Sequence, residues 1–440
     1  MRDVRMELAH QVFRPTVVHL VPAMEQGGVE TVVCDLNRAL VRAGWRSVVV
    51  SNGGRLVAQV REDGGEHVSL DLKSKNPLTA LARAWKLRRV LRAVAGAGET
   101  KDAQDRGDAE DARDVRDARP RCLICAHSRV PAWLFVLARK LDSTIRPFSH
   151  STIRQFGNSI IRPFDHSIIS SLPFITYAHG ANSVSRYSAV MTKGDRVITP
   201  SQFLADYLVA NYAEKDARDK QDKQDERDTG GLRAKIRVIH PAVDFARFDP
   251  AKLDAGVVAD LRRAWGLAAG DRVVMAVGRL TPLKGFDHLI RDLAGQPDVT
   301  PDAGWGDVLR APQAKLVIVG GADKRHLAYA AELKALAASL GVADRVVFAG
   351  PQAKVPECLS LADAVVSGNV TKPESFGLSV AEALAMNRPV RLLRRFGGAA
   401  EILDAVAAAR QPTLREGVRT LCDFDIMSRK TQAAYKELVQ

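Results

Sequence analysis

The chain has 440 residues, of which 46% are hydrophobic and 26% are charged, enough for two or three domains with ordinary cores. This composition excludes a disordered tail and a small disulfide-stapled protein. No apolar run approaches the ~20 residues of a membrane-spanning helix, so an integral membrane protein is not expected. The net charge is +13, with +10 in residues 1–240, and an excess of this kind predicts an acidic partner for the first half.

The amino-terminal residues predict a location. Asp3 and Glu7 stand where a signal peptide would have its apolar stretch. Five scattered cysteines fit a reducing compartment. We therefore expect a cytoplasmic protein.

The first half alternates strand-like and helix-like segments. Residues 16–24 are a mostly apolar run of strand length, Gly27 and Gly28 form a turn, and apolar residues then recur at helical spacing over 29–41. Further strands are predicted at 47–50, 68–72 and 122–126. This alternation predicts a parallel sheet with helices on both faces.

The pattern restarts in the second half, where the strand-like runs are 272–278, 315–321, 345–350 and 362–368, and a helix follows from Leu378. The sequence therefore predicts two doubly wound α/β domains. Ligands of such sheets bind beyond the carboxyl ends of the strands, so the turns that follow strands are the candidate sites.

Three segments fit neither pattern. Residues 101–120 and 214–230 are rich in Asp, Lys and Arg, and we interpret both as solvated loops. Residues 143–170 contain an octapeptide repeat, STIRPFSH, STIRQFGN and SIIRPFDH, followed by the partial copy SIIS. Three short copies are too few for a solenoid, so a dispensable insertion is favoured over a functional module.

The stretch 373–390 carries two carboxylates, Glu374 and Glu382, separated by seven residues. If a helix begins near Gly377, its free N–H groups form a phosphate site. Glu374 in the entering loop and Glu382 one turn into the helix can then accept hydrogen bonds from sugar and ribose hydroxyls. The alternative is that Glu374 caps the helix and Glu382 is a solvated helix residue.

Other candidate residues also follow strands. Arg279 and Lys284 lie in the turn after 272–278, where two cations can converge on a pyrophosphate, although each alone is more often a surface charge. Gly27 and Gly28 allow close approach of a ligand to the backbone, or serve only the turn. His179 follows the apolar run 173–178, where a packing role is an equal alternative.

In their order along the chain, several segments together resemble the retaining glycosyltransferases of family four, of the lipopolysaccharide-core or polysaccharide type. These segments are VPAMEQGGVE, AHSRVPAW, TYAHG, GDRVITPSQFLADYL, IHPAVDFARFDP, AVGRLTPLKGFDHLI, LVIVGG, VVFAG and KPESFGLSVAEALAMNRPV. The resemblance implies an α/β GT-B fold, with two facing Rossmann-like doubly wound domains and a carboxyl-terminal helix that crosses back to the first domain.

The resemblance divides the chain into four parts. Residues 1–240 would form the acceptor-side domain with the three insertions, and 241–270 the linker. Residues 271–423 would form the donor-binding domain, and 424–440 the terminal helix.

The resemblance also implies roles for the candidate residues. Arg279 and Lys284 would neutralise the leaving diphosphate, and Glu382 would hold the ribose. Glu374 would hold the donor-sugar hydroxyls, and His179 would face the reacting sugar from the first domain. Gly27 and Gly28 would border the phosphates and the acceptor. The donor site would also include the residues of the Glu-x7-Glu motif between its carboxylates, Phe376, Gly377 and Leu378.

The expected reaction is transfer of a hexose, without a metal or cofactor, from a nucleotide diphosphate sugar to a glycan or lipid-linked acceptor. Two cations and a helix N-terminus can stabilise a departing diphosphate unaided. Cys122 and Cys125 point to opposite faces of one strand and make a poor zinc site.

The chain departs from the family in three places. Pro241-Ala242 precedes Val243-Asp244 where the family usually has Asn-Gly. Asn387 replaces a glycine, and the residues after 396 run almost directly to the terminal helix, so part of the second domain is shortened. The alternative hypothesis is therefore a catalytically degenerate GT-B protein that keeps the fold and at most nucleotide binding.

Residues 78–94 predict a basic amphipathic helix, with Arg83, Lys86, Arg89 and Arg92 at successive i+3 positions. Such a helix can lie on anionic lipid, so the protein would contact the inner face of the membrane peripherally. A helix with its apolar side in the core is an equal alternative. Nucleic acid is not an expected partner, because the basic residues lack interleaved aromatics and no recognisable binding motif is present.

Overall fold

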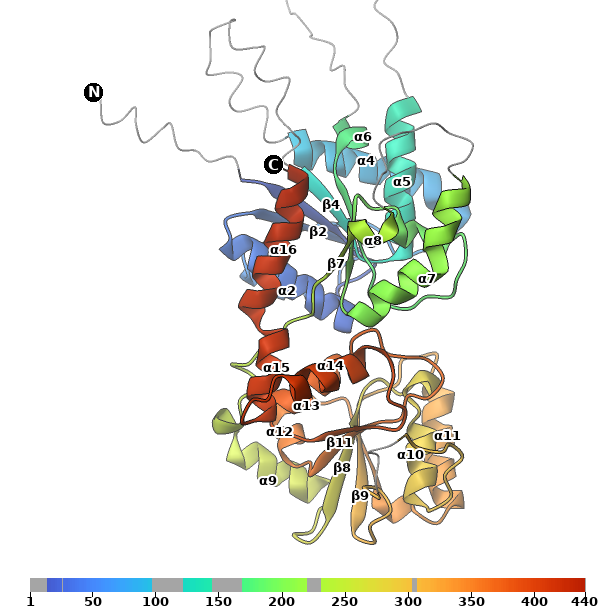
Figure 1. Ribbon diagram of the computed structural model, residues 1–440, viewed down its shortest axis with the longest axis vertical. Coiled ribbons are helices and arrows are strands. Elements are labelled where there is room, and N and C mark those ends of the chain that lie inside the picture. The colour runs from blue at the N-terminus through green and yellow to red at the C-terminus, as the bar shows by residue number, and fades with distance from the viewer. Residues whose placement is uncertain are drawn as a thin grey trace, which may run out of the picture. The chain divides into compact units, whose positions relative to one another are not determined.

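A computed structural model describes residues 14–25, 27–96, 122–144, 168–219, 231–302 and 307–439 (Figure 1). The chain forms two compact units. The first contains residues 1–199, 208–237 and 428–440, and the second contains 200–207 and 238–427. The domain bounds at 240, 270 and 423 stay sequence predictions.

The first unit is built on a seven-stranded sheet in the order β3-β2-β1-β4-β5-β6-β7. Adjacent strands from β3 through to β6 pair in parallel. The strands are β1 (Thr16–Leu20), β2 (Arg46–Ser51), β3 (Glu66–Ser69), β4 (Cys122–Ala126), β5 (Phe174–Tyr177), β6 (Arg196–Thr199) and β7 (Ile236–Val238).

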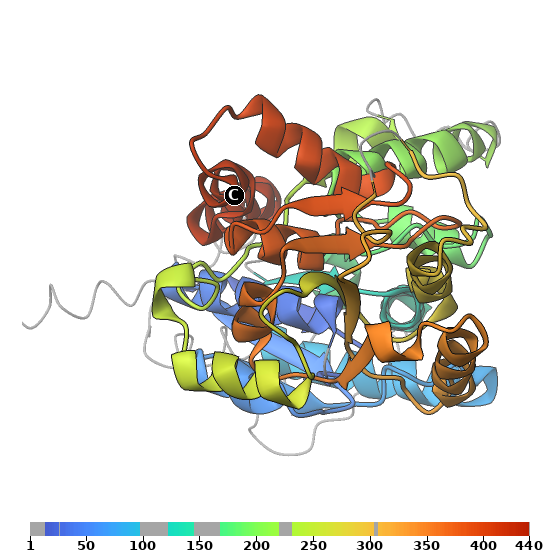
Figure 2. The ribbon, with the colours of Figure 1, turned by 90° about the horizontal axis from the view of Figure 1, so that it is seen from below.

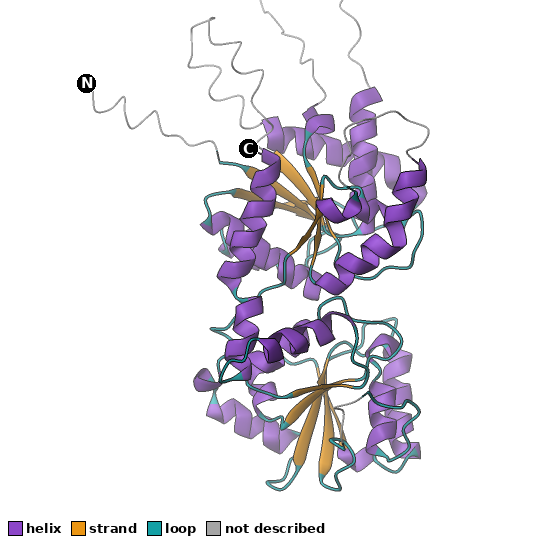
Figure 3. Ribbon diagram, viewed as in Figure 1, coloured by secondary structure: helices purple, strands orange, loops and turns teal. Residues whose placement is uncertain are grey.

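Helices cover both faces of this sheet (Figure 3). On one face, Val18 and Val48 pack with residues of α4 and α5, and on the other Val49 packs with residues of α2. The helices are α2 (Gly28–Arg42), α3 (Val57–Glu62), α4 (Ala80–Gly96), α5 (Arg129–Thr144), α6 (Ile168–Ser171), α7 (Gln202–Asp219), α8 (Leu232–Lys235) and α16 (Phe424–Val439).

The last helix, α16, adds its carboxyl-terminal residues to the first unit. Tyr435 is fully buried, and its ring lies 6.3 Å from that of Trp45. Glu437 forms ion pairs of 2.7 Å with Arg196 and Arg237. The predicted return of the terminal helix to the first domain is confirmed.

The second unit has a five-stranded sheet in the order β10-β9-β8-β11-β12, and all four pairings are parallel. Its strands are β8 (Arg272–Val277), β9 (Ala314–Val319), β10 (Val346–Gly350), β11 (Ala364–Ser367) and β12 (Val390–Leu392). Its helices are α9 (Ala255–Ala264), α10 (Phe286–Leu293), α11 (Leu327–Ser339), α12 (Val355–Ser360), α13 (Leu378–Ala385), α14 (Gly397–Ala408) and α15 (Leu414–Cys422).

Side chains of β8 alternate between the two cores of this unit. Val274 and Ala276 pack with α10 and α11, whereas Val273 and Met275 pack with α9, α12 and α13. Figure 2 shows the helices of this unit on either side of its strands. The α/β class and the doubly wound GT-B fold predicted from the sequence are confirmed.

Each sheet reverses its strand order once. The chain leaves β1 toward β2 and β3 and returns to the other side as β4, and it leaves β8 toward β9 and β10 and returns as β11. The carboxyl ends of β1/β4 and of β8/β11 are therefore the topological switch points, where doubly wound sheets bind their ligands.

The interpretation of 143–170 as an insertion is wrong at both of its ends. Ser143 and Thr144 are the last residues of α5. Residues 168–171 form α6, and Ile169 is fully buried in the core. The backbone N–H of Ile169 donates to Asp142 at 3.1 Å, and Arg88 donates to the same carboxylate at 2.8 Å. Residues 145–167 lie outside the described residues.

The loop expected over 214–230 is also partly wrong, because α7 continues to Asp219. Residues 220–230 and 101–120 lie outside the described residues.

The predicted basic helix over 78–94 forms as α4, but two of its four cations are engaged by the protein. Arg83 is buried and donates to the carbonyl oxygens of Ser74 and Asn76 at 2.6 and 2.8 Å. Arg92 pairs with Asp142 at 2.7 Å. Within the described residues, no helix is long and apolar enough to cross a membrane.

Candidate functional site

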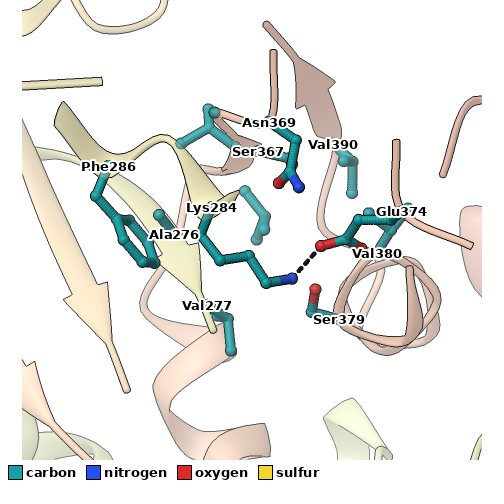
Figure 4. A pocket seen from close by; sticks show the side chains of 13 residues that line it. Ala276, Val277, Lys284, Phe286, Ser367, Asn369, Glu374, Ser379, Val380 and Val390 are labelled. Carbon is teal, nitrogen blue, oxygen red and sulfur yellow. Dashed lines mark hydrogen bonds and ion pairs between the residues drawn. The ribbon is translucent and has the colours of Figure 1, made fainter. Parts of the chain in front are cut away.

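A small pocket lies at the carboxyl ends of β8 and β11, the switch point of the second sheet (Figure 4). Residues of β8, β11 and β12, of the loops that follow β8 and β11, and of the starts of α10 and α13 line it. They are Ala276, Val277, Lys284, Phe286, Val365, Val366, Ser367, Gly368, Asn369, Glu374, Ser379, Val380 and Val390. The pocket brings together two residues predicted from the sequence, Lys284 and Glu374.

Lys284 ends a short 3-10 turn, Pro282–Lys284, between β8 and α10. Its side chain passes over Gly278, where an added Cβ would lie 3.1 Å from the Lys284 Cε. The ammonium group forms an ion pair with the Glu374 carboxylate, and the two side chains retain 28% and 16% of their exposure. Figure 4 shows the two side chains reaching toward each other across the pocket, with Ser379 beside them.

Two glycines that the sequence analysis did not single out bring these loops together. Gly285 has φ of 62°, and a Cβ there would lie 1.9 Å from the carbonyl oxygen of Gly368. In return, a Cβ on Gly368 would lie 2.2 Å from the Gly285 carbonyl oxygen. In the sequence, the signal for this contact was the presence of glycines in the loops that follow β8 and β11, Gly285 and Gly368. Only glycine permits this contact of backbone against backbone.

The loop that carries Glu374 is fixed by its neighbours. The Gly398 N–H donates to the Glu374 carbonyl oxygen at 2.8 Å, and the Ser201 hydroxyl donates to the carbonyl of Ser375. The buried ring of Phe376 stacks on His240, with 5.8 Å between ring centroids. Glu374 is therefore presented by a loop with three anchor points.

Helix α13 begins at Leu378, with Gly377 as its N-cap in the left-handed conformation at φ of 93°. No side chain caps this end. A Cβ on Gly377 would lie 3.2 Å from a Glu374 carboxylate oxygen, so glycine leaves room for that carboxylate. The helix thus starts where the sequence predicted, with Glu374 before it and Glu382 within it.

Glu382 is partly buried on α13. Desolvation raises the pKa of its carboxyl to about 7, and the Arg247 guanidinium opposes that shift. A carboxyl with this pKa exchanges its proton near neutral pH. The reading of Glu382 as a freely solvated helix residue is therefore wrong.

Arg279, by contrast, is exposed in the turn after β8. No hydrogen bond or ion pair holds its side chain to another described residue. Leu378 is half-buried at the first position of α13. Ser379 and Asn369 also line the pocket and were not predicted from the sequence; a serine at a helix start was the available signal.

In the first unit, the two glycines after β1 open helix α2. Gly27 is the N-cap, its backbone is extended, and its carbonyl accepts from the Thr31 N–H at 3.0 Å. An added Cβ on Gly28 would meet no heavy atom within 4 Å. The space beside Gly28 is thus open for a ligand.

His179 follows β5 and is partly buried. Its Nε2 lies 3.0 Å from Nδ1 of His127, and its ring stacks on Tyr177 at 4.2 Å between centroids. Desolvation lowers the pKa of His179 to about 3, so the imidazole is neutral.

Among the described residues, one group has the side chains and spacing to hold a metal ion, namely His19, Cys125 and His127 in the first unit. Cys125 accepts a hydrogen bond from the Tyr435 hydroxyl at 3.5 Å. An Asp-x-Asp sequence at 423–425 opens α16, where the Asp423 side chain accepts from the Asp425 N–H at 2.9 Å and so acts as a helix cap.

Two family models match the chain. Residues 27–218 match the model described as "Glycosyl transferase 4-like domain", and residues 257–407 match "Glycosyl transferases group 1". D-inositol 3-phosphate glycosyltransferase of Mycolicibacterium smegmatis is 34% identical over 179 residues, which cover 40% of this chain. The match covers 36% of that relative, so this chain spans about a third of its length.

Solved structures match over nearly the whole chain. A glycosyltransferase from Rickettsia africae ESF-5 has a TM-score of 0.66 and 21% identity, covering 97% of this chain and 99% of that one. Anabaena Alr3699/HepE, in complex with UDP and glucose, has a TM-score of 0.64 and 17% identity, covering 96% and 99%. The chain is therefore a GT-B protein, similar in both of its domains to glycosyltransferases of the family-four type.

Proposed function

We propose that this protein is a retaining glycosyltransferase that moves a hexose from a nucleotide diphosphate sugar to a glycan or lipid-linked acceptor. The observation that carries the proposal is the pairing of Lys284 with Glu374 beside the uncapped start of α13, at the switch point of the second sheet. A cation, a carboxylate and free N–H groups at one sheet edge are the groups that a sugar diphosphate requires.

In this proposal the leaving diphosphate takes the place of Glu374 at the Lys284 ammonium group. The exposed guanidinium of Arg279 and the N–H groups at Gly377 and Leu378 then share the growing negative charge. Groups that are fixed before the reaction stabilise such charge without reorganisation. Two cations and a helix start supply this stabilisation without a metal ion.

The released Glu374 carboxylate would accept hydrogen bonds from hydroxyls of the transferred sugar, and Glu382 would accept from the ribose. Phe376 holds the loop in place by its stack on His240. We assign to His179 a hydrogen bond to the transferred sugar, and to Gly27 and Gly28 the approach of the phosphates or the acceptor. UDP-glucose is the first donor to test, because Anabaena Alr3699/HepE has been crystallised with UDP and glucose.

A lipid-linked acceptor of the lipopolysaccharide-core or polysaccharide type is supported by the surface of α4 and the turn before it. Leu78, Leu81 and Trp85 are 90%, 59% and 45% exposed, and Lys86 and Arg89 are exposed beside them. We call these five residues the α4 strip. Apolar side chains flanked by cations suit an anionic bilayer surface, and we propose that the strip touches the membrane peripherally.

The test is a screen of nucleotide sugars for release of the nucleoside diphosphate and for transfer to added acceptors. Turnover of one sugar with the anomeric configuration retained in the product supports the proposal. Binding of a nucleoside diphosphate without turnover of any sugar would favour the catalytically degenerate alternative. If the protein neither bound a nucleoside diphosphate nor turned over a sugar, the proposal would be contradicted and the catalytically degenerate alternative would stand.

A further inference from the structure

Three histidines form a continuous chain at the carboxyl edge of the first sheet. His19 lies on β1, and His127 and His179 follow β4 and β5, three neighbouring strands. His19 Nδ1 is 3.0 Å from His127 Nε2, and His127 Nδ1 is 3.0 Å from His179 Nε2. This row of three histidine rings, the histidine chain, therefore crosses the β1/β4 switch point and ends at His179.

All three rings are neutral. His19 is fully buried, and His127 is 2% exposed. Desolvation lowers the pKa of His19 and His179 to about 3, and burial lowers that of His127 well below its usual value. A neutral imidazole carries one N–H and one bare nitrogen, so each ring donates through one nitrogen and accepts through the other.

Only two proton arrangements satisfy both contacts. In the first, His19 donates from Nδ1 to His127, and His127 donates from Nδ1 to His179, which leaves the proton of His179 on Nδ1. In the second, every donor is reversed and the proton of His179 is on Nε2. In both arrangements the middle ring sets the tautomer of His179.

The buried end of the chain distinguishes the two arrangements. His19 Nε2 is buried and has no hydrogen-bond partner within the described residues. The first arrangement leaves that nitrogen bare, whereas the second places an N–H there with nothing to accept it. Buried N–H groups without a partner are rarer in proteins than buried acceptors without one, so the first arrangement is favoured.

We propose that His127 is a positioning residue that holds His179 as the neutral tautomer with its proton on Nδ1. No described residue accepts a hydrogen bond from that Nδ1. His179 then presents a hydrogen-bond donor to an oxygen atom of a ligand at the sheet edge. The identity of this ligand as the transferred sugar rests on the proposed function, whereas the tautomer does not.

The same atoms favour a hydrogen-bonded chain over a metal site. His19 and His127 already make a contact of hydrogen-bond length through Nδ1 and Nε2. Cys125, the third residue of the metal-capable group, accepts from the Tyr435 hydroxyl, and desolvation raises the pKa of its thiol to about 12. A metal would need that thiol deprotonated and that hydrogen bond given up.

The test is nitrogen NMR of the full-length protein labelled with ¹⁵N in its histidine rings, with His179→Gln used to assign the His179 signals. The parent should show a protonated Nδ1 and a bare Nε2 on His179. His127→Asn keeps a donor near the Nδ1 position and should preserve that pattern. His127→Phe removes the donor, and His179 should shift to the Nε2–H tautomer.

Three further variants keep the result interpretable. His19→Leu leaves His127 Nε2 beside an apolar side chain, where a bare nitrogen is again favoured over an N–H, so His179 should keep its proton on Nδ1. His127→Leu also removes the donor and serves if His127→Phe does not fold. His67 lies in the same sheet but bonds to Ser51 at 2.9 Å, so His67→Phe should leave His179 unchanged.

A proton on Nε2 of His179 in the parent, or a His179 proton that stays on Nδ1 in a folded His127→Phe or His127→Leu variant, would overturn the proposal. Binding of stoichiometric zinc that shifts the His19 and His127 signals would also overturn it, since both rings would then be ligands.

If a nucleotide sugar is turned over, kcat of His127→Phe should fall about tenfold with KM for the donor nearly unchanged, and His127→Asn should restore kcat. Absence of turnover would contradict the proposed function and leave the tautomer result standing.

Discussion

Among single residues, Lys284 has the largest part in the proposed reaction. Its pair with Glu374 is only partly buried, and such pairs contribute about 0–1 kcal/mol to folding. A fixed cation at a leaving diphosphate contributes about 3 kcal/mol to the transition state, or about a hundredfold in rate. We therefore expect Lys284→Ala to lower turnover about a hundredfold while the unfolding free energy changes by about 1 kcal/mol or less.

Lys315 offers a matched control, because its ion pair with Asp271 has similar exposure, 23% and 15%. Lys315→Ala should change stability as Lys284→Ala does and leave turnover intact. Steady-state kinetics and urea unfolding of both variants measure this. Equal turnover by Lys284→Ala and the parent would remove Lys284 from the site.

Glu382 gives a prediction about pH. Its pKa in the folded protein is about 7, against an ordinary value of 4.5, so the folded state binds this proton more tightly than the unfolded chain. The contribution of this carboxyl to the unfolding free energy therefore falls as pH rises from about 4.5 to about 7. Glu382→Gln removes that dependence. As pH rises from about 4.5 to about 7, the unfolding free energy of the variant should therefore increase relative to that of the parent by about 1–2 kcal/mol. Urea unfolding at several pH values checks it; parallel curves for the two proteins would contradict the assigned burial.

At the element scale, the turn after β8 depends on a glycine contact that the sequence alone did not reveal. Gly285→Ala would force a Cβ into the Gly368 carbonyl and place alanine at positive φ. We expect it to destabilise the fold by about 2–4 kcal/mol and to displace Lys284. Gly295 is the matched control. It follows α10, the helix that Gly285 precedes, and it has φ of 72° with open space around it. Gly295→Ala should cost only about 1 kcal/mol, and a similar cost for both variants in thermal unfolding would argue against the contact.

The α4 strip gives the second prediction at this scale. Full-length protein should co-sediment with vesicles that contain anionic phospholipid, and the double variant Leu81→Glu/Trp85→Glu should lose most of this binding, because it removes apolar contact and adds negative charge. Leu327 is 60% exposed in the second unit, and Leu327→Glu is the control that should bind as the parent does. Equal binding by all three proteins would show that the strip does not touch lipid.

At the scale of the whole molecule, periodicity predicted most of the fold. Buried parallel strands are continuous apolar runs, so the strand-like stretches near 16–24, 122–126 and 272–278 became β1, β4 and β8. The short strand β12 did not stand out, because Arg391 interrupts its apolar run. The end of the repeat was misassigned because Ile169 is buried by contacts distant in sequence, which local pattern cannot show.

The candidate site was predicted unevenly for the same reason. A motif within one loop and helix, such as Glu374 to Glu382, is visible in sequence. The ion pair of Lys284 with Glu374 joins positions 90 residues apart, and the histidine chain spans three strands, with His19 and His127 108 positions apart. Such contacts arise only when the sheet brings the strand ends together.

The β8/β11 edge of the second unit should hold a nucleoside diphosphate, and calorimetric titration, beginning with UDP, measures this binding. The parent should bind, and Glu382→Ala should bind more weakly by about 5- to 150-fold, because a ribose hydroxyl loses its acceptor. Glu374→Ala should bind no more weakly than the parent, since Glu374 contacts only the sugar and its loss frees Lys284. Equal affinities for the parent and Glu382→Ala, or no binding of any nucleoside diphosphate by the parent, would contradict the account.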